Sequence, residues 1–117
     1  MRASIDILKK YRNRRVAVLG DMLELGEYEK VLHEKTGEYL AESGIDILIA
    51  VGKNAANYKK GALNNGMNED NIFIYDDLIQ AKRFIKDIIY KGDSILIKGS
   101  RGSSMEKIME IFEGDEV

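Results

Sequence analysis

Four short apolar runs divide the chain, and polar stretches of helical length separate them. The runs are nearly continuous and rich in β-branched residues, whereas a half-exposed strand would alternate apolar and polar positions. A continuous run of this kind is typical of a strand buried on both faces of a parallel sheet. The pattern therefore predicts strands over residues 15–20, 45–52, 71–75 and 93–99.

Helical periodicity fills the intervals between the runs. It predicts helices over residues 27–43 and 55–64, a third helix that Asp76 or Asp77 caps, and a fourth that starts at Ser103. Each run is thus followed by one helix. Such a series predicts βαβ construction throughout the chain.

The helix over residues 27–43 carries a candidate core stripe and two residues that interrupt it. His33 lies off the stripe, and Gly37 costs ~1 kcal/mol relative to alanine in a helix interior. Ahead of the first run, Ile5 and Leu8 indicate one further helix. The stripe consists of Tyr28, Val31, Leu32, Tyr39 and Leu40.

These elements predict a single α/β domain of Rossmann-like type. Right-handed crossovers give an open, mainly parallel sheet with helices on both faces. We expect strand order 3-2-1-4, which places the first and last strands side by side. With 117 residues, no proline and no Gly/Ser-rich linker, the chain is expected to form one domain over residues 1–117.

Composition excludes several functions. Without cysteine there is no disulfide framework or thiol nucleophile, and a single histidine, His33, excludes a multi-histidine zinc site. The net charge of −2 gives no general affinity for nucleic acid, so the basic cluster in residues 9–15 is expected to be a solvated connection. No apolar run spans a membrane, and the N-terminus lacks a secretory signal. We expect a cytoplasmic protein without nucleic-acid or membrane partners and without a metal site.

Ligands of open α/β sheets bind beyond the carboxyl ends of the strands. The segment 98–106 follows the last run, with two glycines that allow close backbone approach and the positive charges of Lys98 and Arg101. Ser103 and Glu106 have capping-box spacing at a helix start, where free N–H groups favour an anion. The segment could cradle a carboxylate or phosphate. The alternative is a strand–turn–helix junction with solvated charges.

A second candidate site follows the first run. Asp21, Glu24 and Glu27 lie in a glycine-bounded loop, and His33 comes about two turns into the next helix. A carboxylate directly after a buried strand can hold a cation, an amine or a ligand hydroxyl. The alternative is that Asp21 only turns or caps the chain and that His33 is a packed or solvated side chain.

Two nucleotide-binding signatures do not occur in the sequence. There is no G-x-x-x-x-G-K-[ST] loop, so the chain has no ATP-binding loop of this type. No G-x-G-x-x-G follows the first run, which argues against a nicotinamide-binding domain.

Several segments taken together resemble the C-terminal domain of the Mur ligases. They are residues 14–26, His33, residues 92–101 and residues 105–106, with GDMLELG and KGSR as their most specific parts. The resemblance extends from Met1 to about Phe112. Within the family it is strongest to the branch that joins D-alanyl-D-alanine to UDP-N-acetylmuramoyl-tripeptide.

The resemblance implies a three-domain enzyme of peptidoglycan synthesis. An N-terminal domain would hold the UDP-sugar substrate, and a central domain would bind most of the ATP and Mg²⁺. The substrate carboxylate would become an acyl phosphate, which the amine of D-alanyl-D-alanine attacks, while the C-terminal domain closes the site and helps orient the dipeptide. Because the N-terminal and central domains are absent from residues 1–117, we expect the chain alone to be inactive, and the enzyme to be a monomer.

The implied site lies between the ends of the first and last runs. Asp21 would orient the amine or a phosphate-linked group, and Glu24 and His33 are further candidates. The residues implied to bind anionic groups, chiefly the dipeptide carboxylate, are Lys98, Ser100, Arg101, Ser103 and Ser104.

Two other interpretations stay open on the sequence. A free-standing binding or signalling module of the receiver type also places a carboxylate after its first strand and a lysine after its last, and it would use Asp76 or Asp77. Against it, only one aspartate ends the first run, and four strands are predicted where a receiver has five. The other interpretation is a structural domain without a site.

Overall fold

The computed structural model describes residues 1–99 of the 117-residue chain. The helices are α1 (Arg2–Leu8), α2 (Glu29–Glu42), α3 (Ala55–Asn64) and α4 (Leu78–Ile88). The strands are β1 (Arg15–Leu19), β2 (Ile47–Val51), β3 (Ile72–Tyr75) and β4 (Ser94–Lys98). The helix expected from Ser103 lies outside the described residues, as do the expected site residues Ser100, Arg101, Ser103 and Ser104.

The four strands form one parallel sheet in the order β3-β2-β1-β4, as the sequence predicts. At the centre of β1, Val18 is in register with Ile49 of β2 and Ile97 of β4. Because β1 and β4 are neighbours, their last residues, Leu19 and Lys98, lie side by side at the carboxyl edge of the sheet.

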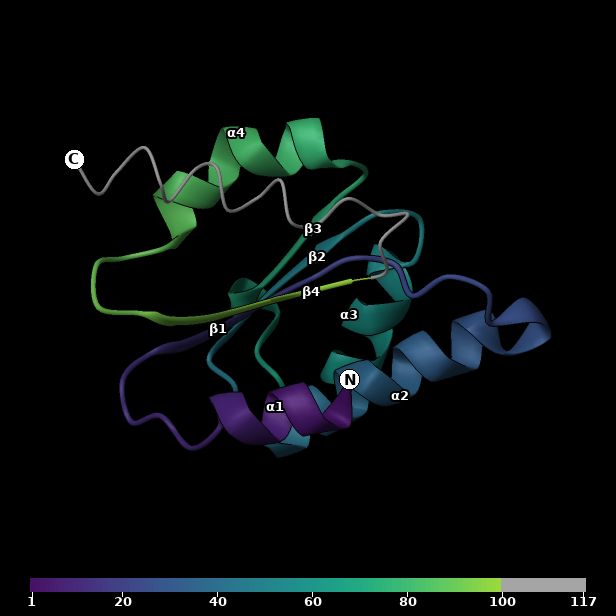
Figure 1. Ribbon diagram of the computed structural model, residues 1–117, viewed down its shortest axis with the longest axis horizontal. Coiled ribbons are helices and arrows are strands. Elements are labelled where there is room, and N and C mark those ends of the chain that lie inside the picture. Colours follow the sequence, from purple (N-terminus) through teal and green to yellow (C-terminus); the bar gives the residue numbers. More distant parts are fainter. Residues whose placement is uncertain (100–117) are drawn as a thin grey trace.

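Helices cover both faces of this sheet (Figure 1). On one face, α1, α2 and α3 pack against alternate strand residues such as Ala17 and Leu48. On the other, Ala81 and Ile85 of α4 pack against Val16 and Ile49. Both faces of β1 and β2 are therefore buried, which is why their sequences are continuous apolar runs.

The predicted boundaries of two helices are confirmed closely. Helix α3 covers residues 55–64 as expected. The cap of α4 is Asp77, whose carboxylate accepts a hydrogen bond from the backbone N–H of Gln80 at 2.9 Å. A 3-10 turn, Gly26–Tyr28, precedes α2, so the α-helix begins two residues later than the predicted residue 27.

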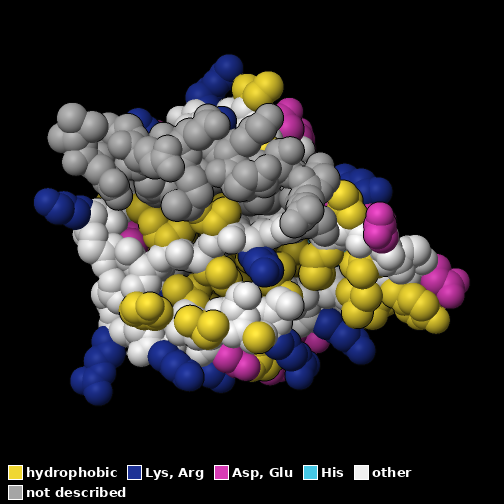
Figure 2. All heavy atoms as spheres, viewed as in Figure 1, with side chains coloured by type: hydrophobic (Ala, Val, Ile, Leu, Met, Phe, Trp, Pro, Cys, Tyr) yellow, Lys and Arg dark blue, Asp and Glu magenta, His cyan; other side chains and the backbone are white. Residues whose placement is uncertain are grey.

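The buried face of α2 differs from the predicted stripe. Its fully covered residues are His33, Gly37 and Leu40, whereas Tyr28 and Val31 are 61% and 46% exposed. Figure 2 shows hydrophobic side chains on the surface at the right of the view, where Figure 1 places α2. Leu40 of the predicted stripe is buried as expected, but the rest of the buried face was missed because a histidine and a glycine give no apolar signal.

This face of α2 packs against α3, and one glycine on each helix lets the two helices cross in close contact. A Cβ built on Gly37 would lie 2.1 Å from the backbone oxygen of Tyr58. A Cβ on Gly61 would lie 1.8 Å from the backbone oxygen of Glu34. No side chain fits at either position, so the helix-propensity cost of Gly37 is offset by the close packing that it permits.

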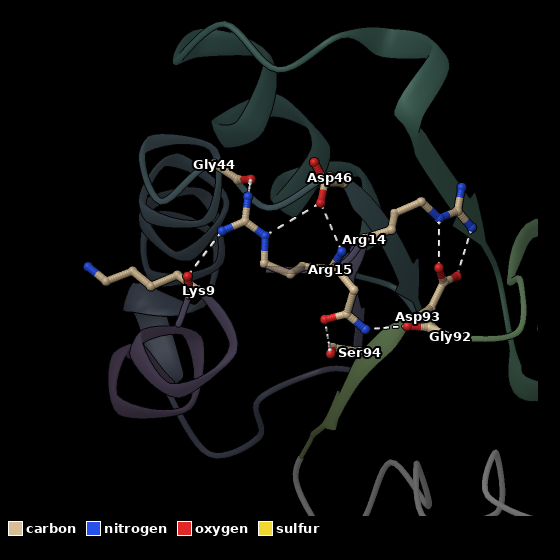
Figure 3. A network of polar contacts seen from close by, with 9 residues as sticks. Lys9, Arg14, Arg15, Gly44, Asp46, Gly92, Asp93 and Ser94 are labelled. Atoms are coloured by element: carbon tan, nitrogen blue, oxygen red, sulfur yellow. Dashed lines mark hydrogen bonds and ion pairs between the residues drawn. The ribbon is translucent and has the colours of Figure 1, made fainter. Parts of the chain in front are cut away.

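At the amino edge of the sheet, two arginines of the basic cluster are bound within the fold (Figure 3). Arg14 forms two hydrogen bonds to Asp93, at 3.0 and 2.9 Å, and Arg15 pairs with Asp46 at 3.4 Å. The expectation of a solvated connection is thus wrong for Arg14 and Arg15. Among residues 1–99, no helix is long and apolar enough to cross a bilayer.

Candidate functional site

The carboxyl edge of the sheet brings the ends of β1 and β4 together. The backbone N–H of Gly20 donates to the carbonyl oxygen of Lys98 at 2.8 Å, which continues the β1–β4 ladder one step beyond β1. Asp21 follows directly. Lys98, the first residue of the second candidate segment, therefore lies beside the start of the first one.

The carboxylate of Asp21 is held by the neighbouring β2–α3 connection. It accepts hydrogen bonds from the backbone N–H groups of Lys53 at 3.2 Å and Asn54 at 2.9 Å. A Cβ on Gly52 would lie 2.5 Å from Asp21 Oδ2, so the glycine makes room for the carboxylate. The structural role weighed for Asp21 is thus observed. Because a carboxylate has about four acceptor positions, it retains capacity for a ligand.

Glu29, Lys53 and Asn54 form a polar cluster beside Asp21. The amide Nδ2 of the buried Asn54 donates to Glu29 Oε1 at 3.0 Å, and Lys53 Nζ lies 3.2 Å from the same oxygen. The hydrogen bond from Asn54 and then that from Lys53 lower the pKa of Glu29. Sequence reasoning did not assign these residues to a site. The signal was the polar pair directly after the run 45–52, at the same edge of the sheet.

His33 is fully buried, and both of its ring nitrogens have backbone partners. Nε2 accepts a hydrogen bond from the backbone N–H of Met22 at 3.0 Å, and Nδ1 lies 2.6 Å from the carbonyl oxygen of Glu29. An acceptor at Nε2 and a donor at Nδ1 define the neutral Nδ1–H tautomer. His33 therefore contacts the backbone next to Asp21 from the protein interior, and its side chain is not exposed at the candidate site.

Tyr58 is a second buried side chain that contacts the backbone next to Asp21. Its hydroxyl donates to the carbonyl oxygen of Gly20 at 2.8 Å, and its ring meets that of His33 edge-on, with centroids 4.9 Å apart. Burial raises the pKa of Tyr58, and the negative charge of Asp21 raises it further. The hydroxyl thus keeps its proton at physiological pH and remains a hydrogen-bond donor.

Glu24 is placed differently from the other candidates. Its side chain is exposed and its backbone φ is +62°, a left-handed conformation that is uncommon for a residue with a side chain. Within residues 1–99, no hydrogen bond or ion pair joins Glu24 to Asp21 or His33.

The Mg²⁺ that the resemblance implies is a hard cation, which proteins bind through one or two carboxylates and the phosphates of a substrate. Among residues 1–99, no group of three or more His, Cys, Asp or Glu side chains is placed to hold a metal ion.

Comparisons with known proteins agree with this fold. UDP-N-acetylmuramoyl-tripeptide–D-alanyl-D-alanine ligase of Bacillus subtilis (strain 168) is 36% identical over 115 residues, which are 94% of this chain and 24% of the relative. The protein of the same name from Escherichia coli (strain K12) is 29% identical over 115 residues, 97% of this chain and 24% of the relative.

Solved structures give the same result. MurF from Acinetobacter baumannii superimposes with a TM-score of 0.84 at 30% identity, over 97% of this chain and 25% of that chain. MurF ligase from Thermotoga maritima in complex with ADP has a TM-score of 0.70 at 28% identity, over 95% of this chain and 24% of that chain. The chain thus spans about a quarter of the length of these relatives.

The family described as "Mur ligase, glutamate ligase domain" matches residues 1–101, which include both candidate segments up to Arg101. The match, the parallel order β3-β2-β1-β4 and the superposition on solved relatives all concern the same elements. This chain belongs to the Mur ligase family and corresponds to the family's glutamate ligase domain.

Proposed function

We propose that this domain is the C-terminal part of an ATP-dependent ligase of peptidoglycan synthesis, which joins D-alanyl-D-alanine to UDP-N-acetylmuramoyl-tripeptide. The relatives with this printed activity match 94% and 97% of the chain. In the proposed reaction, phosphoryl transfer from ATP turns the tripeptide carboxylate into an acyl phosphate and releases ADP. Attack by the dipeptide amine then forms the amide and releases phosphate and a proton.

The domain's part in this reaction is to bind and orient the incoming dipeptide at the carboxyl edge. The observation that supports this role is the hydrogen bond between Gly20 N–H and Lys98 O, which holds the ends of β1 and β4 side by side. Neighbouring strands lie ~4.8 Å apart, so groups on both segments are within reach of one small ligand.

The charges at this edge suit a zwitterionic dipeptide. Lys98 is exposed and attracts the ligand's carboxylate, together with Ser100, Arg101, Ser103 and Ser104 of the adjoining segment. Asp21 has acceptor capacity left for the amine after its two backbone hydrogen bonds. ATP and Mg²⁺ would be bound mainly by the rest of the enzyme.

The receiver-type interpretation disagrees with the order of the strands. A receiver has the order 2-1-3-4-5, in which the first strand lies between the second and third. Here β1 lies between β2 and β4, and β3 is on the outside. In addition, Asp77, a candidate phosphorylation site in that interpretation, caps α4.

A chimera tests the ligase proposal. This chain replaces the matching final quarter of the Bacillus subtilis relative, and ADP release is followed with UDP-N-acetylmuramoyl-tripeptide, with and without D-alanyl-D-alanine. We expect dipeptide-dependent ADP release from the chimera, and none from the relative truncated before this segment or from the chain alone. A folded chimera that binds ATP but shows no dipeptide-dependent release contradicts the proposal.

A further inference from the structure

The segment Gly20–Asp21–Met22 is held on both sides of Asp21 by buried side chains from two helices. The hydroxyl of Tyr58, on α3, donates to the carbonyl oxygen of Gly20 at 2.8 Å. Nε2 of His33, on α2, accepts from the N–H of Met22 at 3.0 Å. Both side chains are 0% exposed. The backbone before and after Asp21 is therefore fixed from inside the protein.

His33 can hold the Met22 backbone because its two ring nitrogens play different hydrogen-bonding roles. A hydrogen bond from Nδ1–H to the carbonyl oxygen of Glu29 leaves Nε2 without a proton, free to accept from Met22. The edge-on contact with the Tyr58 ring fixes the orientation of both rings. An aliphatic side chain would fill the same space, but it would leave the N–H of Met22 without this acceptor.

The position of the Asp21 carboxylate follows from this arrangement. With its backbone held, the side chain reaches the N–H groups of Lys53 and Asn54, while Gly20 N–H bonds to Lys98 O on the other side. The buried contacts of His33 and Tyr58 thus help to set where the Asp21 carboxylate lies relative to Lys98.

We propose that His33 and Tyr58 are positioning residues, which act through the backbone of Gly20–Met22 to fix the Asp21 carboxylate relative to Lys98. Neither side chain contacts the dipeptide. The importance of this arrangement for the dipeptide rests on the proposed function, but the positioning itself does not.

Conservative variants of the 117-residue chain separate positioning from simple packing. His33→Leu fills the space without hydrogen bonds, whereas His33→Gln keeps an acceptor and a donor at the end of a side chain of similar reach. Tyr58→Phe removes one oxygen only. Tyr39→Phe is the matched control, because the Tyr39 hydroxyl donates to Asp6 on α1 and not to the Gly20–Met22 segment.

Nitrogen-15 NMR gives the readout that a packing role would not move. In the unaltered chain we expect the neutral Nδ1–H tautomer at His33 and slow hydrogen exchange at the Met22 amide. We expect His33→Leu and Tyr58→Phe to shift the Asn54 amide resonance, to speed exchange at Met22, and to weaken D-alanyl-D-alanine binding about tenfold, the effect of one lost hydrogen bond. His33→Gln should restore most of each effect, and Tyr39→Phe should have none.

An unchanged Asn54 resonance and unchanged Met22 exchange in folded Tyr58→Phe would overturn the inference, as would an Nε2–H tautomer in the unaltered chain. If His33→Leu does not fold, Tyr58→Phe and His33→Gln carry the test. If the unaltered chain shows the amide signatures but no dipeptide binding, the proposed function fails on the chain while the positioning stands.

Discussion

The carboxylate of Asp21 accepts a hydrogen bond from the backbone N–H of Asn54 at 2.9 Å. Asn54 is the N-cap residue directly before α3, so a side chain that follows β1 bonds to the start of a helix that follows β2. The residue proposed to orient a ligand amine is also a structural link between two βα units. These roles are compatible because backbone N–H groups occupy only part of the carboxylate's acceptor capacity.

Replacement of Asp21 therefore has two separable effects. Asp21→Ala should lower the free energy of unfolding by about 1–2 kcal/mol, the usual cost of a lost helix-capping contact, and should also weaken dipeptide binding. Urea unfolding and ligand titration measure the two effects. Asp76→Ala, at an exposed aspartate beside the α4 cap, should change stability by less than about 0.5 kcal/mol. Equal stability of the two variants would contradict the capping role.

The glycine contact between α2 and α3 gives a prediction opposite to helix propensity. In a free helix Gly37→Ala would be favourable by ~1 kcal/mol. Here the new Cβ would lie 2.1 Å from the backbone oxygen of Tyr58, so the helices must separate, and we expect a net loss of ~1–3 kcal/mol.

Thermal or urea unfolding measures whether Gly37→Ala lowers or raises the free energy of unfolding. Ala56→Gly, at an exposed position of α3, reports the propensity effect alone and should cost ~1 kcal/mol. A Gly37→Ala variant that is more stable than the unaltered chain would show that the two helices do not cross as closely as described.

The Arg14–Asp93 pair at the amino edge predicts a dependence of stability on pH. Burial alone would raise the pKa of Asp93, but hydrogen bonds from the Arg14 side chain and the Tyr90 backbone outweigh it and hold the pKa below its usual value. A carboxyl whose pKa falls on folding stabilises the protein above its unfolded pKa of ~3.9, and this contribution disappears as the pH falls through the folded value.

Asp93→Asn should accordingly cost about 1.5–3 kcal/mol at pH 7, the usual worth of charge-assisted hydrogen bonds. The difference from the unaltered chain should shrink as the pH falls toward 2–3, values well below the unfolded pKa. Urea unfolding at both ends of this range measures it, with Asp76→Asn as the exposed control. A difference that is independent of pH would mean that the charge of Asp93 contributes nothing.

The sequence was sufficient to predict the sheet because its signal is local and strong. Runs such as residues 15–20 and 45–52 are apolar at nearly every position, and only strands covered on both faces need this. The right-handed crossover rule then leaves few topologies, and the predicted order 3-2-1-4 is confirmed. The position of Lys98 beside the end of β1 followed from that order alone.

The interior of the candidate site was harder to predict because its contacts join distant residues of mixed chemistry. The buried face of α2 runs through His33 and Gly37, which an apolar stripe does not detect. The hydrogen bond from Tyr58 to Gly20 spans 38 positions, and that from Asn54 to Glu29 spans 25. Such contacts appear only once the helices are placed on the sheet.

The most direct test of the central claim is an NMR titration of the 117-residue chain with D-alanyl-D-alanine. We predict that the amide resonances of Gly20, Asp21, Lys98 and Gly99 shift as the dipeptide binds. Lys98→Ala should abolish these shifts, and Lys10→Ala, at an exposed lysine outside this edge, should leave them unchanged. Shifts confined to other parts of the sheet, or equal shifts in the two variants, would contradict a dipeptide site between the ends of β1 and β4.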